Sequence, residues 1–127
     1  MHKDKFVSIG IIFILLGVIL GAFGAHFLKD ILKNHQLLSF QTGIRYQIYH
    51  GFAILIFGLN AKKFSKNIQF SLILFTLGII LFSFSIYAIN LKEITGFYHN
   101  FIPIFTPIGG STLIIGWITT LFCLKKN

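Results

Sequence analysis

The chain has 127 residues, of which 55% are hydrophobic and only 11% are charged. A water-soluble domain of this size usually carries about a quarter of charged residues, so the composition excludes an ordinary soluble fold and indicates a membrane protein. The formal net charge of +8 does not indicate a nucleic-acid partner, because the lysines lie at the ends of apolar runs and are not gathered on one face of a folded surface.

The first predicted membrane span covers residues 6–26 and contains no charged residue. This stretch is as long as the roughly 20 residues that a helix needs to cross the hydrocarbon of a bilayer. Gly17, Gly21 and Ala25 are spaced by four, so they share one helical face and allow a close approach by another helix. We expect this face to pack against a helix of the same chain rather than in a dimer.

Residues 28–43 separate the first span from the second and mix leucine and isoleucine with lysine, aspartate and asparagine. This mixture predicts an amphipathic helical segment that lies in the membrane interface. A solvated loop is the alternative interpretation.

The second predicted span, residues 44–61, is the shortest, and Arg45 at its beginning is expected to extend its charge toward the interface or to find a partner. Lys62, Lys63 and Lys66 then form a basic turn. The third predicted span, residues 67–90, is uncharged and rich in phenylalanine, isoleucine and leucine. It is long enough to cross a membrane.

Residues 94–110 carry both prolines of the chain and several glycines, which predicts an irregular loop partly embedded in the interface. The fourth span is expected over residues 107–124, because proline is tolerated in the first turn of a helix. Gly109 and Gly110 lie near its start and are predicted to support close helix packing.

These segments predict an all-α, polytopic membrane protein in which four transmembrane helices form a small bundle and a single domain, residues 1–127. Four spans place both termini and the central turn on one side of the membrane, and that side holds more lysines than the other. Basic loops remain in the cytoplasm, so both termini are predicted to be cytoplasmic and the membrane to be the plasma or bacterial inner membrane. The basic residues of the predicted cytoplasmic side are Lys3, Lys5, Lys62, Lys63, Lys66, Lys125 and Lys126, and those of the other side are Lys29, Lys33, Arg45 and Lys92.

A candidate binding site consists of polar and aromatic residues at the predicted outer ends of the first two spans: His26, Arg45, Tyr46, Tyr49 and His50. Spacings of three and four residues place several of them on one helical face, where they could receive an anionic lipid head group or relay a proton. The alternative is structural, because tyrosine and arginine commonly anchor helices at the membrane interface.

No cofactor or metal is predicted. His26, His35, His50 and His99 have no helical ligand spacing and no nearby cysteine or carboxylate, which disfavours a metal site. The sequence contains no nucleophile turn, no phosphate-binding loop and no paired carboxylates. An enzyme would therefore have to rely on histidine, and we expect none.

Four sequence motifs resemble the family catalogued as domain of unknown function 423: GAFGAH followed by LKD, FQTGIRYQIYH, LFSFSIY and TPIGGSTLIIGW. The resemblance covers nearly the whole chain and extends to YwdK-like and YgdD-like small inner-membrane proteins and to transmembrane protein 256. It implies four helices and supplies no substrate, cofactor or catalytic residue. The family pattern has a small residue where this chain has Phe84.

The leading functional hypothesis is a non-enzymatic membrane protein whose outward-facing polar cluster binds a lipid head group or a small membrane partner. A small oligomeric transporter or channel subunit is the alternative, since Asn60, Ser83, Ser85, Asn90, Thr112 and Thr119 could line a path. A histidine-based membrane enzyme is the third hypothesis.

Overall fold

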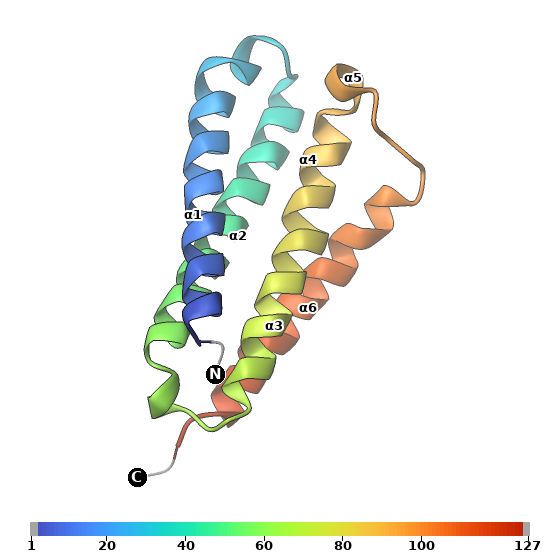
Figure 1. Ribbon diagram of the computed structural model, residues 1–127. Helices are drawn as coiled ribbons and strands as arrows, with labels where there is room; N and C mark the ends of the chain where they lie inside the picture. The colour runs from blue at the N-terminus through green and yellow to red at the C-terminus, as the bar shows by residue number, and fades with distance from the viewer. Residues whose placement is uncertain (1–2, 126–127) are drawn as a thin grey trace.

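The fold was examined in a computed structural model that describes residues 3–125. Two antiparallel hairpins pack side by side: α1 pairs with α2, and the rod formed by α3 and α4 pairs with α6 (Figure 1). A π-helical segment, Ile80–Phe84, joins α3 to α4. The helices are α1 (Lys3–His26), α2 (Asn34–Leu59), α3 (Ile68–Ile79), α4 (Ser85–Asn90), α5 (Lys92–Thr95) and α6 (Ile102–Phe122).

Both ends of the chain lie at the same end of the bundle as the turn between α2 and α3, whereas α5 lies at the opposite end (Figure 1). Within the described residues, three helices are long and apolar enough to cross a membrane: Asp4–His26, the rod Ile68–Asn90 and Ile102–Phe122. The predicted all-helical class is therefore confirmed. The α2 helix has 26 residues and is more polar than these three.

The segment between the first two predicted spans is not a separate amphipathic element. After a 3₁₀ turn at Leu28–Asp30, α2 begins at Asn34 and continues to Leu59 without a break. The Gln36 side chain accepts a hydrogen bond from the backbone N–H of Lys33 at 3.0 Å, which caps the first turn. The prediction missed this continuity because Leu37 and the fully buried Phe40 pack in a cluster with Leu28 and Tyr87 of other elements.

The last helix begins at Ile102 rather than near Pro107. Pro103 occupies the first turn, where a missing N–H costs no intrahelical bond. Pro107 lies inside the helix and its side chain is exposed. The helix continues past it without the one backbone hydrogen bond that its nitrogen cannot donate. The irregular loop is correspondingly shorter than predicted and starts at Gly96, whose φ of 68° ends α5.

The α1–α2 contact has a seven-residue period, with Gly10, Gly17 and Gly24 all buried. A Cβ on Gly10 would lie 2.8 Å from the Gly51 carbonyl oxygen, so the two backbones touch at this level. Gly21 is only partly buried, and Ala25, predicted to continue the packing face, is exposed. Residues spaced by four move progressively around the helix, whereas residues spaced by seven return to nearly the same face. The glycines spaced by seven therefore stay in contact with α2 along the antiparallel pair.

The π-helical segment and α6 approach each other closely at Gly109. A Cβ added to Gly109 would collide with backbone atoms of Leu81 and Phe82 in the π-helical segment, whereas one on Gly110 would lie 3.6 Å from the Phe82 ring in ordinary contact. The adjacent Phe84 ring points the other way, toward α1, with its centroid 6.3 Å from that of Phe13. The π-helical segment therefore contacts α6 through its backbone and α1 through an aromatic ring.

Gly109→Ala is expected to destabilise the bundle by about 1–3 kcal/mol, because the new methyl group overlaps backbone that cannot rotate away. Gly110→Ala provides the matched control and is expected to be neutral or to stabilise the helix by up to about 1 kcal/mol. Unfolding of both variants by a denaturing detergent, followed by circular dichroism, measures the difference. Equal stabilities would contradict the close approach at Gly109.

Candidate functional site

The buried amide of Gln47 connects three helices. Gln47 has no solvent exposure, and its Nε2 donates to the Phe13 carbonyl oxygen of α1 at 2.9 Å. Its Oε1 accepts from the Tyr87 hydroxyl of α4 at 2.6 Å. The polar atoms of this side chain are thus paired inside the bundle, as a membrane interior requires.

Two glycines make room for this arrangement. A Cβ on Gly17 would lie 2.5 Å from the Ile48 side chain and 3.7 Å from Gln47 Nε2, so glycine at this position lets α2 lie close to α1 beside the amide. A Cβ on Gly43 would lie 2.8 Å from the Tyr87 ring. The ring therefore lies directly against the α2 backbone, with its hydroxyl within reach of Gln47.

His50 is also buried, and both of its ring nitrogens have partners. Nδ1 lies 2.7 Å from the Tyr46 carbonyl oxygen, and Nε2 accepts a hydrogen bond from the indole N–H of Trp117 at 2.9 Å. A carbonyl only accepts and an indole N–H only donates, so this pairing fits the neutral tautomer with its hydrogen on Nδ1. His50 consequently joins α2 to α6 and has no free nitrogen to act as a base.

The five residues of the predicted cluster do not converge. Tyr46 stacks on His50 with ring centroids 6.0 Å apart. Arg45 and Tyr49 lie on a neighbouring face of α2 and are exposed, with Tyr49 57% accessible. The Tyr46 ring also lies 6.2 Å from the Tyr49 ring between centroids, so Tyr46, Tyr49 and His50 form one row of rings along α2.

His26 does not reach the others. It is the last residue of α1 and is exposed. The α1 residue Gly24 faces Phe40, which is more than one helical turn before Arg45 along α2. His26 was included in the predicted cluster because it lies at the end of the first span. The register in which α1 and α2 pack keeps it away from the other four residues.

The residues considered for a transport path are hydrogen-bonded within the bundle. Ser83 donates to the Gly43 carbonyl oxygen at 2.7 Å, and the Asn90 amide donates to Ser39 at 2.9 Å. The remaining side chains bond to their own helix or to a neighbouring one: Asn60, Ser85, Thr112 and Thr119. Among residues 3–125, no buried side-chain nitrogen or oxygen lacks a partner.

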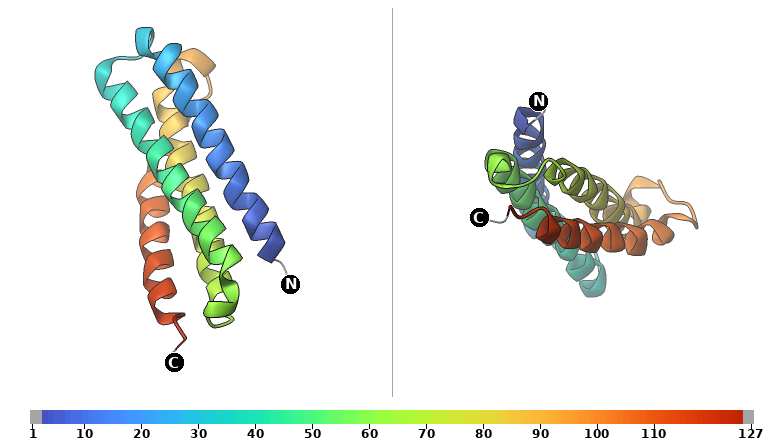
Figure 2. Two further views of the ribbon diagram at one scale, coloured as in Figure 1. Left: turned by 90° about the vertical axis from the view of Figure 1, so that its left-hand side faces the viewer. Right: turned by 90° about the horizontal axis from the view of Figure 1, so that it is seen from below.

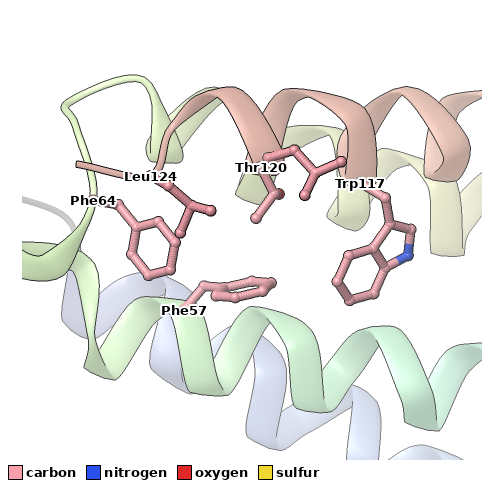
Figure 3. A pocket seen from close by; sticks show the side chains of 6 residues that line it. Phe57, Phe64, Trp117, Thr120 and Leu124 are labelled. Atoms are coloured by element: carbon pink, nitrogen blue, oxygen red, sulfur yellow. The ribbon is translucent and has the colours of Figure 1, made fainter. Parts of the chain in front are cut away.

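The α6 helix lies beside the lower part of α2 (Figure 2, left). Side chains of α2 and α6 border a groove. Its upper hollow, of about 380 Å³, is lined by Tyr46, His50, Phe82, Gly110, Leu113, Ile114 and Trp117. Its lower hollow, of about 350 Å³, is lined by Phe57, Phe64, Trp117, Thr120, Leu121 and Leu124 (Figure 3). Trp117 belongs to both hollows.

Sequence reasoning missed Gln47, Tyr87 and Trp117. Gln47 and Tyr87 were visible as polar residues deep within apolar runs, where an unpaired group is expensive and a partner is expected. Trp117 is the single tryptophan of the chain, but nothing in its neighbours indicates a bond to histidine. In the part of the chain that the structure describes, no three histidine, cysteine, aspartate or glutamate side chains come together as a metal site.

The comparison with protein families matches residues 20–110 to the model described as Protein of unknown function (DUF423). The chain belongs to the DUF423 family. The family resemblance predicted from the motifs is therefore confirmed. The matched DUF423 region includes Gln47, His50 and Tyr87, whereas Phe13 and Trp117 lie outside it.

Relatives of similar length are membrane proteins by name. A UPF0382 membrane protein of Haemophilus influenzae is 36% identical, covering 98% of this chain and 97% of its own. The UPF0382 membrane protein YwdK of Bacillus subtilis is 35% identical, covering 95% of this chain and 96% of its own. A UPF0382 membrane protein of Staphylococcus aureus is 36% identical over 95% of each chain. No solved structure matches.

A double-mutant cycle on Gln47→Leu and Tyr87→Phe tests the central bridge. Each single variant strands a buried polar atom and is expected to cost about 1–3 kcal/mol. The coupling energy between them is expected near 0.6 kcal/mol and below about 1.7 kcal/mol, the range found for hydrogen bonds within membranes. Detergent unfolding of the four proteins measures it, and a coupling indistinguishable from zero would contradict the hydrogen bond.

Proposed function

We propose that this protein is a non-enzymatic, four-span protein of the bacterial plasma membrane that binds a phospholipid head group at Arg45. The fourth span is α2, which packs along both α1 and the α3–α4 rod. Its polarity is compatible with a span because Gln47 and His50 face inward and are hydrogen-bonded. Four crossings agree with both termini lying at one end of the bundle (Figure 1).

The charge distribution supports cytoplasmic termini. The end of the bundle that holds the termini carries exposed Lys5, Lys62, Lys63 and Lys66 as well as Lys125. Lysines in short loops favour the cytoplasmic side. The opposite end carries fewer lysines, and two of the three acidic residues of the chain, Asp30 and Glu93, lie there.

Single cysteines on either side of α2 test this topology in a Cys123→Ser background. In intact cells, Lys33→Cys is expected to react with a membrane-impermeant maleimide, because it lies beyond the outer end of α2. Lys63→Cys is expected to react only after the cells are permeabilised. Equal reactivity of the two in intact cells would show that α2 does not cross, and the reverse pattern would invert the topology.

The observation that carries the head-group proposal is the position of Arg45. Its neighbours on α2, Gly43 and Gln47, contact Ser83 and Tyr87 of the central rod, so the Arg45 backbone lies at the depth of the apolar helices. Yet the side chain is exposed. A charge at this depth normally has a partner, and the three acidic residues, Asp4, Asp30 and Glu93, are at helix ends.

A phospholipid phosphate provides that partner. The Arg45 Nη2 donates to the Thr42 hydroxyl at 3.0 Å, which directs the guanidinium one turn toward the outer end of α2. There it can bind a phosphate through two parallel hydrogen bonds. Tyr49, four residues further on, exposes its ring on the same face and offers an apolar surface to the lipid chains below the guanidinium.

The other two hypotheses receive less support. An internal transport path requires free polar groups, whereas the buried hydroxyls and amides are paired with one another. A histidine-based reaction requires an available ring nitrogen, and both nitrogens of His50 are engaged. A membrane partner protein that supplies a carboxylate to Arg45 is the remaining competitor and requires the same exposed guanidinium.

Native mass spectrometry of the full-length protein, released from vesicles that contain phosphatidylglycerol, tests the head-group site. Arg45→Gln is expected to lower the fraction carrying the anionic lipid several-fold, and Arg45→Lys to lower it less, since lysine keeps the charge but loses the two-pronged geometry. Lys33→Gln removes one charge at the same end and serves as the matched control. Unchanged lipid retention in Arg45→Gln would refute the site.

A further inference from the structure

A hollow with positive charge lies next to the groove between α2 and α6, at the end of the bundle that holds the termini. Phe64 lines the lower apolar hollow on one side (Figure 3). On its other side Phe64 lines a further hollow of about 390 Å³, together with Lys62, Lys66 and Lys125. An apolar chamber and a basic one therefore share a single aromatic wall.

The wall is fixed by the end of the chain. Phe64 and Leu124 form an isolated antiparallel bridge, and the backbone N–H of Ser65 donates to the Cys123 carbonyl oxygen at 2.8 Å. The Lys125 ammonium donates to the Lys62 carbonyl oxygen at 2.8 Å. This bond holds the charge of Lys125 over the turn that also carries Lys62 and Lys66.

The basic hollow has little negative charge to balance it. Of the three acidic residues of the chain, only Asp4 belongs to this end, and no carboxylate side chain of residues 3–125 lines the hollow. Clusters of lysine beside the hydrocarbon attract anionic lipids. The apolar hollow next to it has the size of a small-molecule site, and the hydrocarbon of the surrounding bilayer fills such a space with a chain.

We propose that this groove holds one acyl chain of an anionic phospholipid whose phosphate contacts Lys62, Lys66 and Lys125. The chain lies against Phe57, Phe64 and Trp117. The site belongs to the leaflet next to the chain termini and is separate from the Arg45 site, so neither depends on the other. Its chemistry is that of a phosphate joined to an apolar chain, which distinguishes it from a site for free phosphate.

Trp117 reports on this groove because it is the only tryptophan of the chain and lines both apolar hollows. The full-length protein is reconstituted in phosphatidylcholine vesicles that contain an equal mole fraction of one brominated lipid, either phosphatidylglycerol or phosphatidylcholine. Brominated phosphatidylglycerol is expected to quench Trp117 fluorescence at least about two-fold more strongly than brominated phosphatidylcholine does, because the lysines enrich the anionic lipid at the groove. Equal quenching by the two lipids would overturn the proposal.

Charge variants connect the quenching to the basic hollow. Lys62→Gln combined with Lys66→Gln and Lys125→Gln is expected to abolish the preference for phosphatidylglycerol. The matched control, Lys29→Gln with Lys33→Gln and Lys92→Gln, removes the same charge at the opposite end and is expected to retain it. Loss of the preference in both would reflect the overall charge and would overturn the site.

Three further arms keep the experiment decisive. Replacing the three lysines by arginine is expected to preserve the preference, which separates a charge effect from misfolding. Arg45→Gln is expected to leave the quenching unchanged, so the two sites fail independently. Inorganic phosphate is compared with sodium chloride at equal ionic strength; if phosphate alone abolishes the preference, the hollow binds free phosphate and the lipid assignment is wrong.

Discussion

The side-chain amide of Gln47 is the interaction on which the arrangement of the bundle depends. It accepts from Tyr87 and donates to the carbonyl of Phe13, so one side chain of α2 fixes both the depth of α1 and that of α4. Lipid offers no competing hydrogen-bond partners, which makes this register specific even where the net free energy of each bond is small. Gly43 lets the Tyr87 ring lie against the α2 backbone, and Gly17 makes room for the Ile48 side chain beside the amide.

The same principle divides the polar groups of α2 into two kinds. Gln47 and His50 point into the bundle and are fully paired, so they act as cross-links between helices. Arg45 points outward and bonds only to Thr42, on its own helix. The hydrogen bonds of Gln47 and His50 account fully for these two side chains as structural residues. Arg45, in contrast, carries a charge that the bundle does not neutralise. A ligand is therefore expected at Arg45 and not at His50.

Much of the fold could be predicted from the sequence, because uninterrupted apolar runs specify membrane-length helices. The first and third runs gave helix limits close to Lys3–His26 and Ile68–Asn90. The prediction failed where the composition of a segment does not show which way its side chains point. Residues 34–43 look amphipathic yet belong to α2, since their apolar face meets α1, and Pro107 did not mark a helix start because its ring faces outward. For the site, spacing along α2 identified Tyr46 with His50, but Trp117 is distant in sequence and its bond to His50 depends on how the two hairpins dock.

The position of α6 after helices α1 to α5 has a consequence for biosynthesis. Trp117, Thr119 and Thr106 are the partners of His50, Ser71 and Ser85, all of which precede them in translation. Until the last helix has left the ribosome and entered the bilayer, those three earlier side chains lack the partners that they have in the finished bundle. Buried polar groups need hydrogen-bond partners inside the membrane, so this requirement favours docking of α6 against the helices already inserted, and these three bonds form only after α6 has been made.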